Sequence, residues 1–133
     1  MGKKFWISAV VMFVLASVLS YLAHEVLLKA DYAKLGAMMR PAAEMQARLG
    51  YVVLAHISFA LAFTWIYIEG KENKPWLMQG IRYGIAIVLV AVVPMYLIYH
   101  SVTPTPLDVA IKQIVYDGIS TLVLGAVLAW INR

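Results

Sequence analysis

Four long apolar stretches constrain this chain more than any other feature of its sequence. They cover about residues 5–28, 50–68, 75–100 and 107–131, and each is close to the roughly 20 helical residues that cross a bilayer core of about 30 Å. Hydrophobic residues make up 63% of the 133 residues and charged residues only 14%. A domain this small cannot hide so much apolar surface from water. The sequence therefore predicts one integral membrane domain and excludes a soluble monomer.

The connections between these stretches predict an all-α fold, an antiparallel up-down-up-down four-helix bundle. Two of the connections, residues 69–74 and 101–106, are too short to join anything but neighbouring antiparallel helices. The third, residues 29–49, is predicted to be an interfacial segment. It is expected to contain a short helix from Asp31 to Met39, followed by a helix that starts near residue 41 and continues into the second span.

Two further patterns bear on how the four helices pack. Gly80 and Gly84 are four residues apart, a spacing that lets two membrane helices approach closely. Similar small-residue faces are expected at Ala16/Ser20, Ser58/Ala62 and Gly118/Gly125. Both the first and the third span also end in a Tyr-Leu…His pattern, at His24 and His100. This leaves open whether the two hairpins are a repeat of the kind found in some transporters.

Orientation is predicted from the residues that flank the spans. The four tryptophans fall on one side of an up-down-up-down arrangement, as expected for side chains that favour the membrane–water boundary. Basic residues divide six to four in favour of the same side: Lys3, Lys4, Lys71, Lys74, Arg82 and Arg133 against Lys29, Lys34, Arg40 and Arg48. The prediction is an inner-membrane, multi-pass protein whose N- and C-termini are cytoplasmic.

Ionisable residues within the spans are the candidates for function, because they are costly in lipid. Asp117 is the sharpest case, since it lies about 14 Å along the fourth span, near the bilayer midplane. With His56 it could form a pathway for protons or a small solute. The full set of candidates is Asp117, His56, Gln113, Tyr116, Lys112 and Arg82. A structural pairing of Asp117 with Lys112, Arg82 or a tyrosine hydroxyl is the alternative interpretation.

Metal or haem binding is a separate possibility. The weak candidate ligands are His24, His56, His100 and Glu25, of which His24 and His56 are the pair that could be arranged around a haem. No spacing on one helix supports a metal site, and the absence of cysteine excludes thiolate ligands and thiolate catalysis. No cofactor is predicted, although a haem or a metal ion stays open.

Several segments together resemble a family of small four-span bacterial inner-membrane proteins of unknown function. The resemblance implies a bacterial inner-membrane protein and carries over no functional residues. It rests on His24-Glu25-Val26-Leu27-Leu28, Asp31-Tyr32, Arg40-Pro41-Ala42-Ala43-Glu44-Met45, Trp65-Ile66-Tyr67, Lys74-Pro75-Trp76-Leu77 and Lys112-Gln113-Ile114-Val115-Tyr116-Asp117.

Three functions therefore compete. No catalytic motif is present, so the first is a non-enzymatic accessory or interaction component that acts by helix–helix contacts. The alternative is a carrier or binding protein for a small solute, an ion or protons, with a polar site in the outer half around Asp117 and His56. The third is a haem- or metal-binding protein. The expected partners are the lipid bilayer and either further copies of the chain or a larger membrane complex. Nucleic acid is not expected, because membrane-flanking residues account for the net charge of +4.

Overall fold

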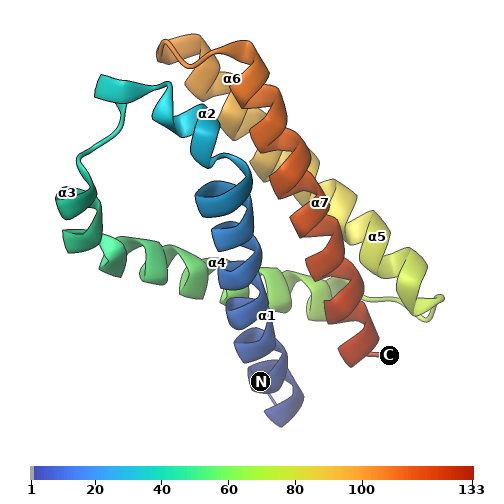
Figure 1. Cartoon of the computed structure of the whole chain (residues 1–133). Helices are drawn as coiled ribbons and strands as arrows, with labels where there is room; N and C mark the ends of the chain where they lie inside the picture. Colours follow the sequence, from blue (N-terminus) through green and yellow to red (C-terminus); the bar gives the residue numbers. More distant parts are fainter. Residues whose placement is uncertain (1) are drawn as a thin grey trace.

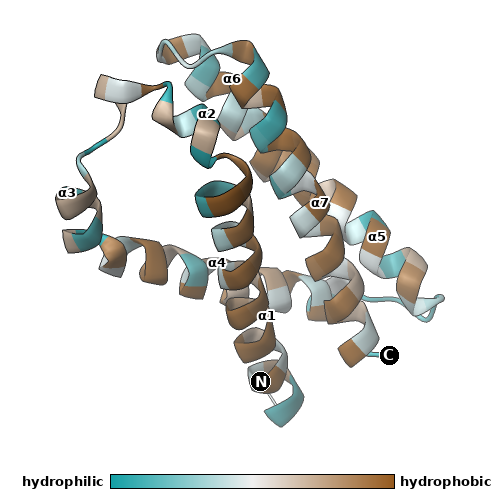
Figure 2. Ribbon diagram, viewed as in Figure 1, coloured by the Kyte–Doolittle hydropathy of each residue, from teal (hydrophilic) through white to brown (hydrophobic). Residues whose placement is uncertain are grey.

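The computed structural model describes residues 2–133 and, over that range, contains helices and connecting segments but no strand. Four helical runs are long and apolar enough to cross a membrane, which confirms the four predicted spans with only small changes at their ends. In Figure 2 hydrophobic residues cover most of the length of these runs. They are α1 (Lys3–Tyr21) with the π-helix Leu22–Leu27, then α4 (Leu49–Gly70), then α5 (Trp76–Ile87) with the π-helix Val88–Val92 and α6 (Val93–Val102), and finally α7 (Leu107–Ile131).

The segment between the first two spans differs from its prediction. It consists of α2 (Lys29–Ala33), a 3-10 turn and α3 (Ala42–Ala47). The short helix is not continuous to Met39, because Gly36 adopts a φ of +46°, a left-handed conformation that ends the helical path.

The predicted continuous helix from α3 into α4 is also wrong. Arg48 separates the two helices with φ −109° and ψ 7°. Its backbone N–H bonds to the Met45 carbonyl, while its guanidinium takes the Glu44 carbonyl that a continuous helix would use. The chain therefore changes direction just before it enters the second span.

Contact between α5 and α7 is the closest in the fold, and it confirms the predicted role of Gly80 and Gly84. A methyl group on Gly80 would lie 2.5 Å from the Gly125 carbonyl oxygen, and one on Gly84 would lie 3.0 Å from the Leu122 Cα. Without side chains at these positions, the two backbones can pack directly against each other. This contact holds α7, which carries Asp117, against the third span.

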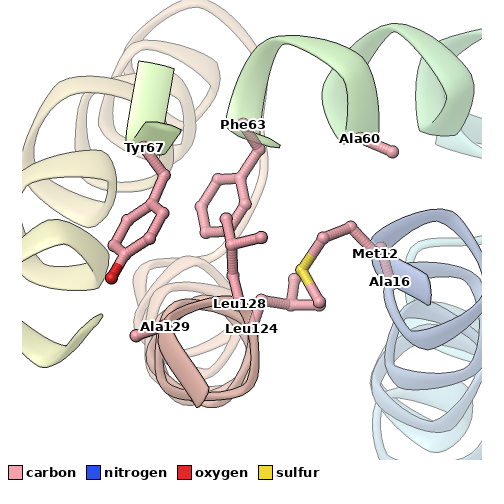
Figure 3. Close-up of a cluster of buried hydrophobic side chains, with 8 residues drawn as sticks. All are labelled: Met12, Ala16, Ala60, Phe63, Tyr67, Leu124, Leu128 and Ala129. Carbon is pink, nitrogen blue, oxygen red and sulfur yellow. The ribbon is translucent and has the colours of Figure 1, made fainter. Parts of the chain in front are cut away.

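A hydrophobic cluster joins α1, α4 and α7. Figure 3 shows its side chains pointing toward one another from the three helices. Met12 and Leu128 are fully buried within it, and the aromatic ring of Phe63 stacks on that of Phe59. The complete cluster consists of Met12, Ala16, Ala60, Phe63, Tyr67, Leu124, Leu128 and Ala129.

The second span is arranged differently from the other three. In Figure 1, α4 lies across α1, whereas α5 and α6 follow α7. Only the C-terminal half of α4 is buried, at Ala60, Phe63, Thr64 and Tyr67, and residues 49–55 are all exposed. Residues at the start of α4 are apolar on every side, so no single face directs this half onto a neighbouring helix.

The other spans define two ends of the molecule. At the first, here called the terminal end, the Lys4 ammonium reaches the Arg133 carbonyl and the Lys71 ammonium donates to the Asn132 carbonyl at 3.2 Å. The start of α1, the end of α7 and the turn between α4 and α5 therefore lie together. The opposite end, here called the loop end, holds α2 and the turn of residues 103–106. The candidate site lies toward the loop end.

The proposed repeat of two hairpins gains no support from the positions of matching residues. Tyr21 is 63% exposed, while its counterpart Tyr96 is buried. His24 contacts the fourth span, whereas His100 bonds through Nδ1 to the Thr105 carbonyl in the adjacent turn. The matching residues therefore have different environments and different partners.

Candidate functional site

Asp117 is held in a network of polar side chains from three helical runs. Its carboxylate lies 3.2 Å from the His24 Nε2 through each of its two oxygens. The Tyr96 hydroxyl, which is buried in α6, donates a hydrogen bond to the Asp117 Oδ2. The predicted pairing of Asp117 with a tyrosine hydroxyl is therefore present, and a histidine partner is added to it.

Local departures from α-helix accompany two of these residues. His24 lies within the π-helix Leu22–Leu27, and the π-helix Val88–Val92 directly precedes the helix of Tyr96. The second is explained by Pro94, which lacks the N–H that would bond to the carbonyl four residues earlier and whose ring crowds that carbonyl. Wide turns of this kind are found often at functional sites. Here they adjoin or contain His24 and Tyr96, the two residues that donate hydrogen bonds to the Asp117 carboxylate.

The network extends from His24 toward the loop end. The His24 Nδ1 lies 2.6 Å from the Tyr32 hydroxyl, and the Gln113 amide donates to the same hydroxyl at 3.1 Å. The rings of His24 and Tyr32 are also stacked, with an interplanar angle of 9°. Burial raises the pKa of Tyr32, which keeps its hydroxyl protonated at neutral pH.

One assignment of hydrogens satisfies every member of this chain. Gln113 donates to the Tyr32 oxygen, the Tyr32 hydroxyl donates to the His24 Nδ1, and the His24 Nε2–H donates to Asp117. The Asp117 carboxylate, when ionised, then accepts from both His24 and Tyr96. The hydrogen bonds form one directed chain from Gln113 to Asp117.

The network separates two cavities. The cavity here called the Asp117 pocket has a volume of about 250 Å³ and lies between α1, α4 and α7. The cavity here called the Tyr32 pocket has a volume of about 340 Å³ and is lined by Tyr32, Tyr96 and Gln113 together with residues of the loop end. The polar residues of the Asp117 pocket are Ser20, His24, His56, Asp117, Ser120 and Thr121. The hydrogen-bonded chain therefore joins two cavities on different sides of the site.

Lys112 has a different partner from the one considered for it. Its ammonium lies 2.7 Å from the Oδ1 of Asp31, not near Asp117. Asp31 is only 6% exposed, and the hydrogen-bonded Lys112 ammonium holds its pKa below the usual value. A pairing with Asp117 on the same helix was one of the alternatives, but the α2 segment folds back onto α7 and supplies the nearer acid. This ion pair fixes the segment that carries Tyr32.

We expect the Asp31–Lys112 pair to make stability depend on pH. The folded-state pKa of Asp31 is lower than the unfolded value of about 3.9. The contribution is therefore complete above that value and is lost as the pH falls through the folded pKa. Asp31→Asn should lower the unfolding temperature in detergent by a small, measurable amount at pH 7, with a difference from wild type that shrinks below about pH 4. Glu25→Gln, at an exposed acid of the same end, serves as the control; an equal effect of both variants would contradict the assignment.

The remaining sequence candidates are dispersed. His56 lines the Asp117 pocket, but its Nδ1 bonds to the Val52 carbonyl of its own helix at 2.8 Å. Arg82 lies toward the terminal end and lines a separate cavity. Tyr116 is partly buried and makes no side-chain hydrogen bond to the described residues. Only Gln113 and Asp117 of the six pathway candidates belong to the hydrogen-bonded network.

The metal hypothesis gains little from this geometry. Both ring nitrogens of His24 have partners, Tyr32 and Asp117, so neither could bind a metal without breaking the network. His56 shares the Asp117 pocket with His24, whereas His100 is bonded to its own turn. Glu25 is exposed. Within residues 2–133, no three His, Asp or Glu side chains are grouped closely enough to hold a metal ion.

Sequence reasoning missed Tyr32 and Tyr96 as members of the site. Tyr32 belongs to the segment that was predicted to lie at the interface, and nothing in its spacing indicates a return toward His24. Tyr96 follows Pro94 on the third span and was noted only as part of the possible repeat. The one usable signal was the rule that a buried tyrosine hydroxyl needs a hydrogen-bond partner.

Comparison of the chain with protein-family models, curated proteins and solved structures finds no match. The functional interpretation therefore depends on the geometry of the site.

Proposed function

We propose that this protein is a membrane carrier that moves protons through the Asp117 network and couples them to a small solute in the Asp117 pocket. The observation that carries the proposal is the placement of the Asp117 carboxylate between His24 and Tyr96, at the end of a continuous hydrogen-bonded chain. An intramembrane acid with a histidine partner is a common element of proton relays. Asp117 would be the proton acceptor and His24 the shuttle.

The proton would enter from the Tyr32 pocket. A proton that arrives at the Tyr32 oxygen allows the hydroxyl to pass its own hydrogen to the His24 Nδ1, 2.6 Å away. The resulting imidazolium then gives its Nε2 proton to the Asp117 carboxylate. One proton has entered and one has reached Asp117, which stays neutral until it releases that proton into the Asp117 pocket that it lines. His24 is left with its hydrogen on Nδ1 and must return to the first tautomer before the next transfer.

Neutralisation of Asp117 changes what the Asp117 pocket can bind. The ionised carboxylate favours a cationic or hydrogen-bond-donating solute, and the protonated acid loses that attraction. Ser20, Ser120 and His56 supply further polar groups around an otherwise apolar lining. A small polar solute bound beside Asp117 would therefore be released when the proton arrives, which is the basis of coupling.

A second candidate function, an accessory component that works by helix–helix contact, is favoured by one observation. The first half of α4 is exposed and apolar, and the small residues Ser58 and Ala62 on this helix are exposed as well. Another helix, from a second copy or from a partner subunit, would complete an antiparallel bundle on this side. Proton movement by the purified protein alone would count against this candidate.

We further propose that the protein lies in the bacterial inner membrane with the terminal end in the cytoplasm. Lys3, Lys4, Lys71, Lys74 and Arg133 gather at this end, which agrees with the rule that cytoplasmic flanks are enriched in basic residues. The loop end, with the Tyr32 pocket, would then face the outside. Protons would enter from the side on which a respiring cell holds them in excess.

The test replaces Tyr32 by phenylalanine, which removes one oxygen from the relay and keeps the stacked ring. Purified protein is placed in liposomes that contain a pH-sensitive dye, and an acid gradient is applied. Wild type is expected to acidify the lumen faster than empty liposomes. Tyr32→Phe should slow this flux roughly a hundredfold, as for a lost proton-transfer group.

Tyr51→Phe is the matched control, because Tyr51 is 74% exposed and lies outside the network. Its flux should equal that of wild type. A wild-type flux no greater than that of empty liposomes would overturn the proton proposal. An unchanged flux in Tyr32→Phe would remove Tyr32 from the path and leave the proposed route without its entrance.

A further inference from the structure

A third cavity, with several charged residues in its lining, lies at the terminal end between α4 and α5. It has a volume of about 330 Å³ and lies well away from the Asp117 network. Its charged lining residues are Lys71, Glu72, Lys74 and Arg82. Three cations and one carboxylate leave a net charge of +2, so the cavity attracts an anion.

Arg82 is the group in this cavity that most needs a partner. It lies six residues after the start of α5, about 9 Å along the helix from Trp76. No hydrogen bond or ion pair joins its guanidinium to any of the described residues 2–133. A guanidinium at this depth is costly unless an anion pairs with it or its stem reaches the boundary. Its planar set of N–H donors is suited to the bidentate recognition of a phosphate.

The other polar groups of the cavity are already engaged with one another. Glu72 is paired with Lys74, and the ammonium of Lys74 is the main cause of a lowered pKa of Glu72. The Gln79 amide bonds to the backbone of Glu72 and Lys74, and the Tyr83 hydroxyl donates to the Phe63 carbonyl at 2.6 Å. The Glu72 carboxylate is therefore paired directly with Lys74, and the charge of Arg82 contributes only the smallest part of the lowering of its pKa.

The mouth of the cavity is expected to face lipid, because exposed residues of two candidate membrane-spanning helices line it. Ile66, on its α4 side, is 49% exposed, and Arg82 itself is exposed on α5. Both lie within membrane-spanning helices, close to their ends at the turn of residues 71–75. An anion that enters here is therefore in the headgroup region of the bilayer, and exposed apolar residues such as Ile66 lie beside it for an acyl chain to cover.

We propose that this cavity binds the phosphate headgroup of an anionic phospholipid, with Arg82 as its principal ligand and Lys71 and Lys74 as supporting charges. The group that the cavity would recognise is a phosphate anion, and a phospholipid headgroup and a free phosphate ion both carry it. The position of the mouth beside lipid favours the phospholipid. The net charge of +2 favours an anionic headgroup over a zwitterionic one, because the cavity would repel the ammonium group of the zwitterionic headgroup.

The experiment measures lipid retention by native mass spectrometry of the purified protein. The protein is mixed with equal amounts of phosphatidylglycerol and phosphatidylcholine in detergent. Wild type is expected to retain phosphatidylglycerol in preference to phosphatidylcholine. Arg82→Gln should lose about tenfold in phosphatidylglycerol binding, as for the loss of one charge-assisted contact, while Arg82→Lys should lose less.

Arg40→Gln is the matched control, because it removes one exposed guanidinium from the segment between the first two spans and should leave lipid binding unchanged. The unfolding temperature of each variant without lipid shows whether it is folded. Equal retention of the two lipids by wild type, or equal retention by wild type and a folded Arg82→Gln, would overturn the proposal. Displacement of the lipid by excess inorganic phosphate would assign the site to a free anion instead. None of these outcomes depends on the proton flux of the Asp117 network.

Discussion

Replacement of Gly125 by alanine is expected to force α5 and α7 apart and to cause a large loss of stability. Gly125 and Gly80 face each other so closely that a methyl group on Gly80 would lie 2.5 Å from the Gly125 carbonyl oxygen. The reciprocal methyl group on Gly125 would meet the Gly80 backbone. Backbone cannot move aside as a side chain can, so overpacking of about 3 kcal/mol, the upper part of the usual range, is expected.

Gly118→Ala is the control for this prediction. It adds the same methyl group to the same helix, but its nearest neighbour would be a Val88 methyl carbon at 3.8 Å, an ordinary contact. Unfolding by denaturant in detergent micelles should therefore place Gly118→Ala near wild type and Gly125→Ala well below it. Similar midpoints for the two alanine variants would mean that α5 and α7 are not in direct backbone contact.

Asp117→Asn is expected to abolish proton flux while preserving the fold. Asparagine has nearly the same shape as aspartate and can still accept from either Tyr96 or His24, but its amide cannot take up the proton that His24 delivers. Flux in liposomes should fall to that of empty liposomes. Stability should fall by about 1–3 kcal/mol, because one buried donor loses its charged acceptor.

Two variants sharpen the interpretation of Asp117→Asn. Asp108→Asn removes an exposed carboxylate from the first turn of the same helix and should leave flux unchanged. Asp117→Leu should destabilise the protein more than Asp117→Asn, since both His24 and Tyr96 then lose their acceptor. Normal flux in a folded Asp117→Asn would show that the carboxylate is structural and would refute its role as proton acceptor.

The parts of the fold that follow from local rules were predictable. Four spans follow from the length and hydrophobicity of their stretches, and a close helix contact at Gly80 and Gly84 follows from their four-residue spacing, although that spacing does not show that α7 is the partner. The importance of Asp117 followed from its depth alone, because a carboxylate there must have partners. These features depend on short stretches of chain and on the general cost of polar groups in lipid.

The partners of the polar groups were not predictable in the same way. Lys112 pairs with Asp31, which is 81 residues away in sequence, and Tyr32 reaches His24 because α2 turns back over the loop end. Such contacts depend on how the segment of residues 29–49 folds, and its apolar and polar residues show no clear period. The position of α4 across α1 could not be predicted from the sequence either, because a helix that is apolar on every side does not show which face will be buried.

The origin of the network in distant parts of the chain has a consequence for biogenesis. His24 lies at the end of the first span and Asp117 within the fourth, 93 residues later. Before the fourth span is inserted, the His24 Nε2–H has no acceptor and the Tyr32 oxygen lacks its Gln113 donor, although the hydrogen bond between Tyr32 and His24 can already form. The complete hydrogen-bonded chain from Gln113 to Asp117 can therefore form only after the fourth span has been inserted beside the first.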